Sequence, residues 1–204
     1  MRGEAHVWYW AIRGILGFIS KLLFRVKIEQ AGNVPAQGPV IVCANHISWW
    51  DPILVANAMR RPIHFMAKVE LFRNPVFGYV MRRINAFPVD RGKPDLSAIR
   101  DSIAILQSGK VLGIFPEGTR HKAKEVLGEM HPGAALVALR TGSPVVPIAI
   151  RGRYAFRGTV TVLFGEPMVL EGSTGRASKD MVEGANAITE AITALWERLG
   201  EGVA

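Results

Sequence analysis

The chain contains very little cysteine and no long uninterrupted apolar run. Its 204 residues include a single cysteine, Cys43, so an internal disulfide is excluded and nothing indicates an oxidising compartment. Cys43 lies inside an apolar run, and we interpret it as a small core residue rather than as a nucleophile. No metal site is predicted, because the five histidines show no ligand spacing with cysteine or carboxylate clusters.

The chain also lacks internal repeats, low-complexity segments and blocks of basic residues, although it is strongly basic overall. Lysine and arginine number 25 against 17 aspartates and glutamates, which gives a net charge of +8. Such a balance favours an anionic partner: nucleic acid, anionic lipid headgroups or a phosphorylated substrate. The sequence has no RNP pattern, zinc-finger spacing or basic heptad region, so we expect no nucleic acid partner.

The most apolar segment is residues 7–26, yet it fits neither a membrane-spanning helix nor a signal peptide. Arg13 and Lys21 interrupt it, and no small-residue cleavage site follows. On a helix, Arg13, Lys21 and Arg25 share one side. The pattern predicts an amphipathic helix in the membrane interface, with its cations toward anionic headgroups. The alternative is a helix that packs on the core of the protein itself.

The rest of the chain alternates short apolar runs with helical patterns. Strands are expected at residues 40–44, 63–67, 84–89, 111–115, 145–150 and 159–164. Helices are expected at residues 95–109, at 133–140 and from 178 onward. This alternation predicts one α/β domain over residues 27–204, with residues 1–26 as a separate membrane-associating segment. The sheet is expected to be mixed and mostly parallel, with helices on its faces.

A possible catalytic pair lies in NHISWWD, residues 45–51, directly after the first expected strand. On a helix, His46 and Asp51 would be about 140° apart and would not meet. However, Asp51 and Pro52 are typical of an N-cap and a first helical residue, so a preceding loop can fold Asp51 against His46. A carboxylate on one imidazole nitrogen lets the other accept a proton from a hydroxyl. A satisfied core histidine in a capped turn remains an alternative.

Polar and cationic residues follow three other expected strands. FPEGTR, residues 115–120, contains a glycine that permits close backbone approach and an arginine suited to phosphate. Because active sites of α/β sheets lie at strand ends, these residues predict one anion-binding rim beside the pair. The candidate phosphate-binding residues are Lys68, Arg91, Glu117, Gly118, Thr119 and Arg120.

Four blocks resemble, in order, those of the glycerolipid acyltransferase family, and specifically its bacterial 1-acyl-glycerol-3-phosphate acyltransferases. They are NHISWWD, INAFPVDR, FPEGTR and VVPIAI. The resemblance spans residues 40–167, most of the chain. One departure is EMHPGAAL, where His131 and Pro132 stand in place of the lysine that the family usually has before the helix.

The resemblance implies a glycerol-3-phosphate acyltransferase-like fold and an enzyme of phospholipid biosynthesis. It would move an acyl group from acyl-CoA or acyl-carrier protein to the free hydroxyl of lysophosphatidic acid, giving phosphatidic acid, without a cofactor. His46 would be the general base, Asp51 would orient it, and Ser48 and Cys43 would be bystanders. The protein would be peripheral or monotopic, on anionic lipids at the cytoplasmic face of the cell membrane.

Three alternatives remain open at this point. The acceptor could be glycerol 3-phosphate, a lyso-aminolipid or a lysophospholipid. The chain could be a non-catalytic lipid-binding module. It could also be a serine hydrolase that uses Ser48, although the GxSxG signature of such enzymes is absent.

Overall fold

The structure, a computed structural model, describes residues 2–90, 92, 95–118, 130–172 and 175–201. Its helices are α1 (Arg2–Leu23), α2 (Asp51–Ala58), α3 (Pro75–Arg83), α4 (Leu96–Gln107), α5 (Gly133–Thr141) and α6 (Ala177–Glu201). Two short 3-10 helices are η1 (Ala31–Asn33) and η2 (Val69–Phe72). The strands are β1 (Arg25–Glu29), β2 (Val40–Ala44), β3 (Ile63–Lys68), β4 (Phe87–Val89), β5 (Val111–Ile114), β6 (Val145–Gly152) and β7 (Thr159–Phe164).

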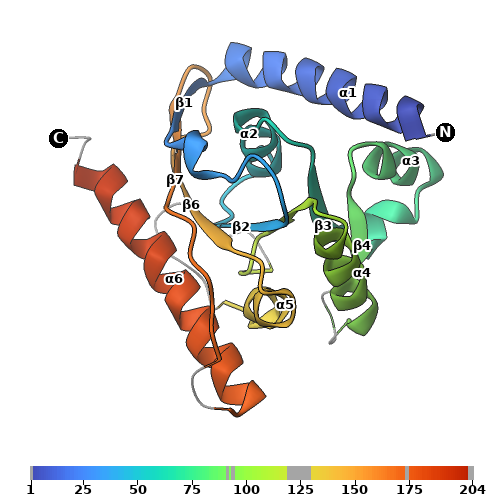
Figure 1. The fold of residues 1–204 in the computed structure, drawn as a ribbon. Coiled ribbons are helices and arrows are strands. Elements are labelled where there is room, and N and C mark those ends of the chain that lie inside the picture. The colour runs from blue at the N-terminus through green and yellow to red at the C-terminus, as the bar shows by residue number, and fades with distance from the viewer. Residues whose placement is uncertain (1, 91, 93–94, 119–129, 173–174, 202–204) are drawn as a thin grey trace.

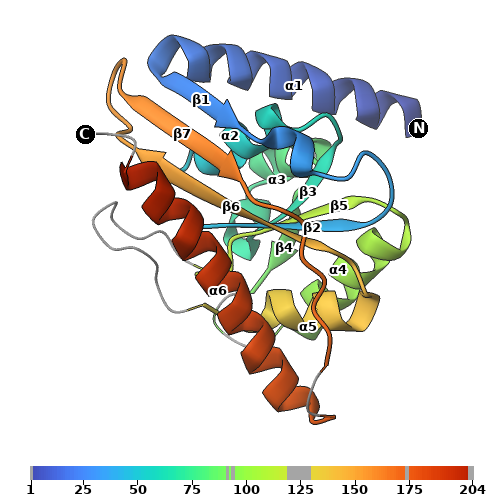
Figure 2. The same cartoon turned by 60° about the vertical axis from the view of Figure 1, so that its left-hand side comes forward.

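The strands form one seven-stranded sheet in the order β1-β7-β6-β2-β5-β3-β4. All neighbours pair in parallel except β6 and β7, which are antiparallel. The predicted mixed, mostly parallel sheet is therefore confirmed. Figure 2 shows the order across the sheet, with β2 near its middle.

Helices cover both faces of the sheet, and the central strand is buried on both sides. Every residue of β2 is buried, as expected for a parallel strand between two helical layers. Val40 and Val42 pack in the core cluster on the side of α1 and α2, whereas Ile41 and Cys43 pack with α4, α5 and α6. Figure 1 shows these layers, with α1 across the top and α5 and α6 below the sheet.

Most of the expected elements are present, with differences at their ends. The third expected strand is shorter than predicted, because α3 extends to Arg83 and the strand begins only at Phe87. Asn85 has a φ of 60°, in the left-handed region that ends the helical path. Besides the two short 3-10 helices, one strand and one α-helix were not predicted. β1 is an exposed edge strand, and α3 begins where the Asn74 side chain accepts the N–H groups of residues 76 and 77.

The N-terminal segment is helical, but the prediction that its cations point away from the domain is wrong for Arg13. The polar side of α1 faces the domain: the Arg13 guanidinium donates to the carbonyls of Asn57 (3.2 Å) and Met59 (2.7 Å) at the end of α2. These carbonyls have no partner within their own helix, so the cation is drawn inward. Tyr9 is also buried, and its hydroxyl accepts the N–H of Ile63. This side of α1 therefore agrees with the alternative given above, a helix that packs on the core of the protein itself.

The opposite side of α1 exposes a stripe of apolar side chains, and Lys21 is exposed at its margin. Exposed large side chains here are Val7, Trp8, Ile15, Phe18, Ile19 and Leu22. They follow one another around about a third of the helix, at the spacing of a continuous stripe. None of the helices that the structure describes has the length and apolar content needed to cross a bilayer.

Candidate active site

The site lies where two central strands end. β2 and β5 are parallel neighbours, so the NHISWWD loop after β2 lies beside the loop that begins with Phe115. Asn45, the first residue of the NHISWWD loop, ties this loop to β6. Its side-chain amide donates to the carbonyl of Ile150 (2.9 Å) and accepts the N–H of the same residue (2.7 Å). This side chain continues the pairing of β2 with β6 by one further residue and sets the direction in which the chain leaves the sheet.

His46 is held on three sides. Its Nδ1 is 2.8 Å from Oδ2 of Asp51, its backbone N–H donates to Oε1 of Glu117 (3.0 Å), and its ring stacks on Phe115 at 4.2 Å between centroids. The predicted contact between His46 and Asp51 is therefore present. Among the described residues, Nε2 has no hydrogen-bond partner. With Nδ1–H directed at Asp51, Nε2 is free to accept a proton.

Asp51 is fully buried, and its carboxylate is surrounded by donors. Oδ2 also accepts the backbone N–H groups of Ile47 and Ser48, both at 2.7 Å, and Oδ1 accepts the hydroxyl of Tyr154. These donors replace the water that a buried carboxylate loses. Asp51 is thus not the predicted N-cap. It is the first residue of α2, and its side chain turns back to the preceding loop.

The structure describes the first four residues of FPEGTR, and two of them, Glu117 and Gly118, shape the site through their contacts. Glu117 is buried, and its bond to the N–H of His46 joins the two loops directly. Gly118 has a φ of 66°, and a Cβ placed there would lie 3.0 Å from the ring of His131. His131 is itself fixed by its N–H, which donates to the carbonyl of Pro116 (2.9 Å). A glycine is therefore required in this turn, both for its conformation and for the approach of His131.

The cationic candidates lie at adjacent strand ends or outside the described residues. Lys68 ends β3, which pairs with β5, so it lies on the same edge of the sheet as His46. Its ammonium is exposed and forms an ion pair with Glu70 at 3.3 Å. Arg91, Thr119 and Arg120 lie outside the described residues.

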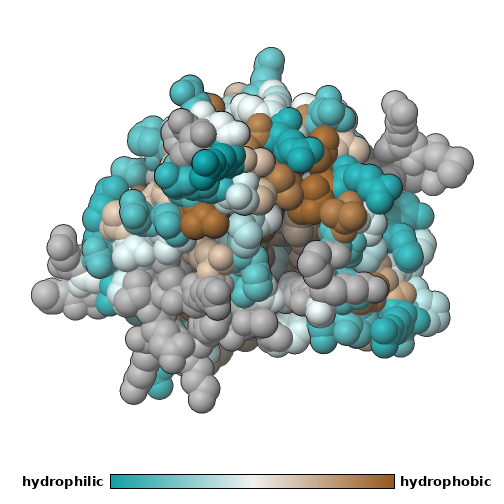
Figure 3. All heavy atoms as spheres, turned by 90° about the horizontal axis from the view of Figure 1, so that it is seen from below, coloured by the Kyte–Doolittle hydropathy of each residue, from teal (hydrophilic) through white to brown (hydrophobic). Residues whose placement is uncertain are grey.

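A cavity opens beside the loop that begins with Phe115. Its volume of about 620 Å³ lies within the usual range of ligand pockets. Most of its lining is apolar, and α4 and α5 contribute part of it, including Ile99 and Leu136. Asp90, Asp95 and His131 supply polar groups. Figure 3 shows the face formed by the lower helices, where apolar side chains gather beside a hollow. An apolar cavity that reaches Phe115, the ring on which His46 stacks, suits a substrate with a hydrocarbon chain.

Two residues near the pair could in principle act as nucleophiles, Cys43 and Ser48, and both are poorly placed. Cys43 is completely buried in β2, and burial raises the pKa of its thiol to about 12, so it remains protonated. The Ser48 hydroxyl accepts the N–H of Trp50 at 3.2 Å, while Nδ1 of His46 is directed at Asp51. The geometry thus favours direct use of His46 on a bound hydroxyl.

Tyr154 is the contact of Asp51 that sequence reasoning missed. It reaches Asp51 from a position 103 residues further along the chain. No local pattern marks it, because the contact depends on the packing of the β6–β7 connection against the start of α2. Burial, and next the charge of Asp51, raise the pKa of Tyr154, so its hydroxyl remains a donor.

Comparison with known proteins gives consistent matches. A family model described as acyltransferase matches residues 25–151. The chain is 35% identical over 173 residues to the 1-acyl-sn-glycerol-3-phosphate acyltransferase of Bacillus subtilis, with 82% of this chain and 84% of the relative covered. It is 32% identical over 209 residues to the protein of the same name from Streptococcus pneumoniae, with 98% of this chain and 72% of the relative covered.

The fold also matches a solved structure. The crystal structure of the 1-acyl-sn-glycerophosphate (LPA) acyltransferase from Thermotoga maritima superposes with a TM-score of 0.72 at 25% identity. The match covers 98% of this chain and 84% of that one.

Proposed function

The chain belongs to the acyltransferase family, and we propose that it transfers a fatty acyl group to the free hydroxyl of 1-acyl-glycerol 3-phosphate, forming phosphatidic acid. The names of the relatives support this acceptor. The observation that carries the proposal is the buried pair itself, in which Asp51 holds Nδ1 of His46 and leaves Nε2 for a substrate.

The proposed reaction is a direct acyl transfer. Nε2 of His46 takes the proton of the acceptor hydroxyl while its oxygen attacks the thioester carbonyl, and the Asp51 carboxylate stabilises the imidazolium that forms. The tetrahedral intermediate then expels the thiolate, which takes the proton back from His46. The C–S bond breaks, an ester forms and a free thiol results. Acyl-CoA or acyl-carrier protein is the proposed donor, and no cofactor is needed.

The acceptor phosphate is proposed to bind along the neighbouring strand ends. Lys68, Arg91 and Arg120 are the proposed cationic contacts, and Glu117, Gly118 and Thr119 are proposed to shape the loop. The position of Lys68 on the same edge as His46 supports the first of these contacts. A guanidinium or ammonium gives strong, charge-assisted hydrogen bonds to phosphate.

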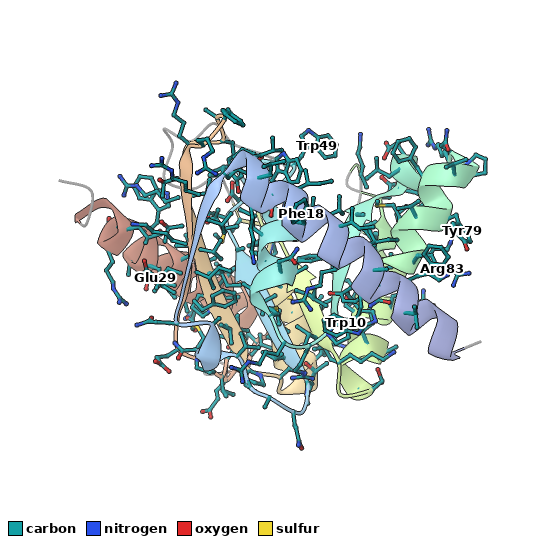
Figure 4. The ribbon with its side chains drawn as sticks, turned by 90° about the horizontal axis from the view of Figure 1, so that it is seen from above. Trp10, Phe18, Glu29, Trp49, Tyr79 and Arg83 are labelled. Atoms are coloured by element: carbon teal, nitrogen blue, oxygen red, sulfur yellow. The ribbon has the colours of Figure 1, made fainter. Side chains whose placement is uncertain are left out.

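We propose that the protein binds the cytoplasmic face of the membrane peripherally, with the outward face of α1 in the lipid interface. The exposed apolar stripe of α1 supports this, and the exposed ring of Trp49 lies beside it. In Figure 4, Trp49 and Tyr79 lie on one flank of α1, and Trp10 lies on the other. Arg83, whose guanidinium stacks on Tyr79, adds a cation on that same flank.

The test is acceptor-dependent release of thiol from an acyl thioester. The purified protein is given acyl-CoA or acylated acyl-carrier protein, each with lysophosphatidic acid, glycerol 3-phosphate, a lyso-aminolipid, another lysophospholipid or no acceptor. Release that requires lysophosphatidic acid supports the proposal, and a preference for another acceptor reassigns the substrate. Release without any acceptor indicates a hydrolase, and no release with either thioester donor indicates a lipid-binding module.

A further inference from the structure

We propose that Tyr154 is a positioning residue of this reaction, which completes a His46–Asp51–Tyr154 array. The inference rests on the proposed function, because it assigns a role within the same reaction. Its basis is that Tyr154 donates to the one oxygen of Asp51 that His46 does not use.

The two oxygens of Asp51 have different partners. Oδ2 accepts Nδ1–H of His46 and two backbone N–H groups of the loop. Among the described residues, Oδ1 has the hydroxyl of Tyr154 as its partner. Since Asp51 is fully buried, removal of this hydroxyl leaves a charged oxygen without a donor. Tyr154 therefore determines how much negative charge Asp51 directs at His46.

Aromatic packing holds the hydroxyl of Tyr154 in place. The ring of Tyr154 meets the buried ring of Phe24 edge to face at 5.2 Å, and Phe24 meets Trp50 in the same manner at 5.5 Å. Trp50 directly precedes Asp51 in the chain. The ring of the tyrosine is thus fixed by the same cluster that supports the start of α2, and its hydroxyl needs no reorganisation to reach Asp51.

The electrostatic consequence has a definite sign. The donated O–H withdraws negative charge from the carboxylate and so limits how strongly Asp51 favours a proton on His46. Without it, the carboxylate carries more charge toward the imidazole, while the N–H groups of Ile47 and Ser48 still hold Oδ2 in place. His46 then stays protonated to higher pH, and a protonated imidazole cannot act as a base.

The experiment measures thiol release with lysophosphatidic acid against pH for the wild type, Tyr154→Phe and the control Phe156→Leu, which alters an exposed aromatic residue of the same β6–β7 connection. For Tyr154→Phe we expect kcat to fall about tenfold at pH 7, the size of one lost charged hydrogen bond, with KM for the acceptor within about twofold. We also expect the acidic limb of the kcat profile to move to higher pH. Phe156→Leu should match the wild type. An unchanged limb and kcat in Tyr154→Phe overturn the proposal.

A second variant covers the case in which Tyr154→Phe does not fold. Site-specific 3-fluorotyrosine at position 154 keeps the ring and makes the hydroxyl a stronger donor, so the acidic limb should move in the opposite direction, to lower pH. No movement contradicts the proposal.

An NMR titration of the His46 imidazole separates this inference from the proposed function. If no acceptor is acylated but the titration midpoint rises in Tyr154→Phe, the proposed function fails and the role of Tyr154 stands. If lysophosphatidic acid is acylated but the midpoint and the pH profile are unchanged in Tyr154→Phe, the role of Tyr154 fails alone.

Discussion

At the scale of single residues, the contacts of each side chain indicate which groups near the site can take part in the proposed reaction. Cys43 and Ser48 are the nucleophiles that an acyl-enzyme route would use. One is a buried thiol with its pKa raised to about 12, and the other accepts a backbone N–H of its own loop. His46, in contrast, is held by Asp51 with one ring nitrogen left over. This arrangement favours direct transfer between two bound substrates.

Replacing either nucleophile should therefore leave turnover largely intact. For Cys43→Ala and Ser48→Ala we expect kcat within about threefold of the wild type, since neither change removes the base, whose loss typically costs ~10²–10⁴. Rapid quenching during turnover with radiolabelled acyl-CoA should recover no acylated protein. If the wild-type protein carries the label and one of the two variants does not, the reaction passes through an acyl-enzyme instead.

Lys68 allows the proposed phosphate contact to be tested at one residue. It is exposed, so a contact from its ammonium is partly screened, and Lys68→Ala should raise KM for lysophosphatidic acid by up to about fivefold with kcat little changed. Lys110→Ala is the matched control, because Lys110 is exposed at the opposite edge of the sheet, directly before β5. Equal KM values for the two variants would remove Lys68 from the acceptor site.

At the scale of elements, caps and strand ends determine where the helices begin. Asp95 caps α4, and its carboxylate accepts the N–H groups of Asp90 and Ala98 and the hydroxyl of Ser97. These hydrogen bonds, that from Asp90 first, lower the pKa of Asp95 to about 2. The folded state therefore binds this proton less readily than the unfolded chain, and the stabilisation is lost as pH falls from about 4 toward 2.

Variants of Asp95 should separate the cap from its charge. Asp95→Ala should destabilise the protein by about 1 kcal/mol at pH 7, because the orphan N–H groups lose their acceptor. Asp95→Asn should keep most of the cap but remove this part of the acid sensitivity. Urea denaturation at pH 7 and pH 3 tests both, with Asp101→Asn, exposed on the same helix, as the control. An Asn variant as acid-sensitive as the wild type would contradict this assignment.

Elements with strong local signals were predictable, and those that depend on distant partners were not. The Asp95 cap, the buried strand β2 and the strand end at Phe115 follow from patterns within a few residues. β1 was not predicted, because it is a mostly exposed edge strand whose pairing with β7 lies far along the sequence. The helix α1 was predicted, but not which side packs: that depends on the carbonyls at the end of α2, which Arg13 satisfies.

At the scale of the whole molecule, α1 lies between the proposed membrane-binding surface and α2, the helix that begins with Asp51. Its inward side contacts α2 through Arg13, and its outward side is an apolar stripe that includes Phe18 and Leu22. Removal of α1 would therefore also remove packing from α2, and loss of membrane binding in a truncated chain would be ambiguous. Point substitutions on the outward side avoid this difficulty.

The double variant Phe18→Asp with Leu22→Asp should reduce membrane binding without loss of fold, because both side chains are exposed and two charges oppose insertion in the interface. We expect the wild type to float with vesicles that contain anionic lipid and most of the double variant to stay at the bottom of the gradient. Val182→Asp, on an exposed position of α6, is the control and should float. Equal flotation of all three proteins would exclude α1 as the lipid contact.

The sheet order explains how the site could be partly foreseen. Parallel strands bring loops from distant parts of the sequence to one edge, so His46 and Glu117 meet although they are 71 residues apart. The motifs indicated which loops carry chemistry, and the α/β pattern placed them on the same edge. The third partner, Tyr154, could not be foreseen, because it comes from the connection between two strands that pair antiparallel.

The central claim is that Nε2 of His46 is the base that activates the acceptor hydroxyl. Its most direct test is the rate of thiol release with lysophosphatidic acid for His46→Ala and for His46→Gln, which is closer in volume. We predict a loss of ~10²–10⁴ in kcat for both variants, with a thermal midpoint close to that of the wild type. Either variant keeping most of the wild-type rate while folded would contradict the account.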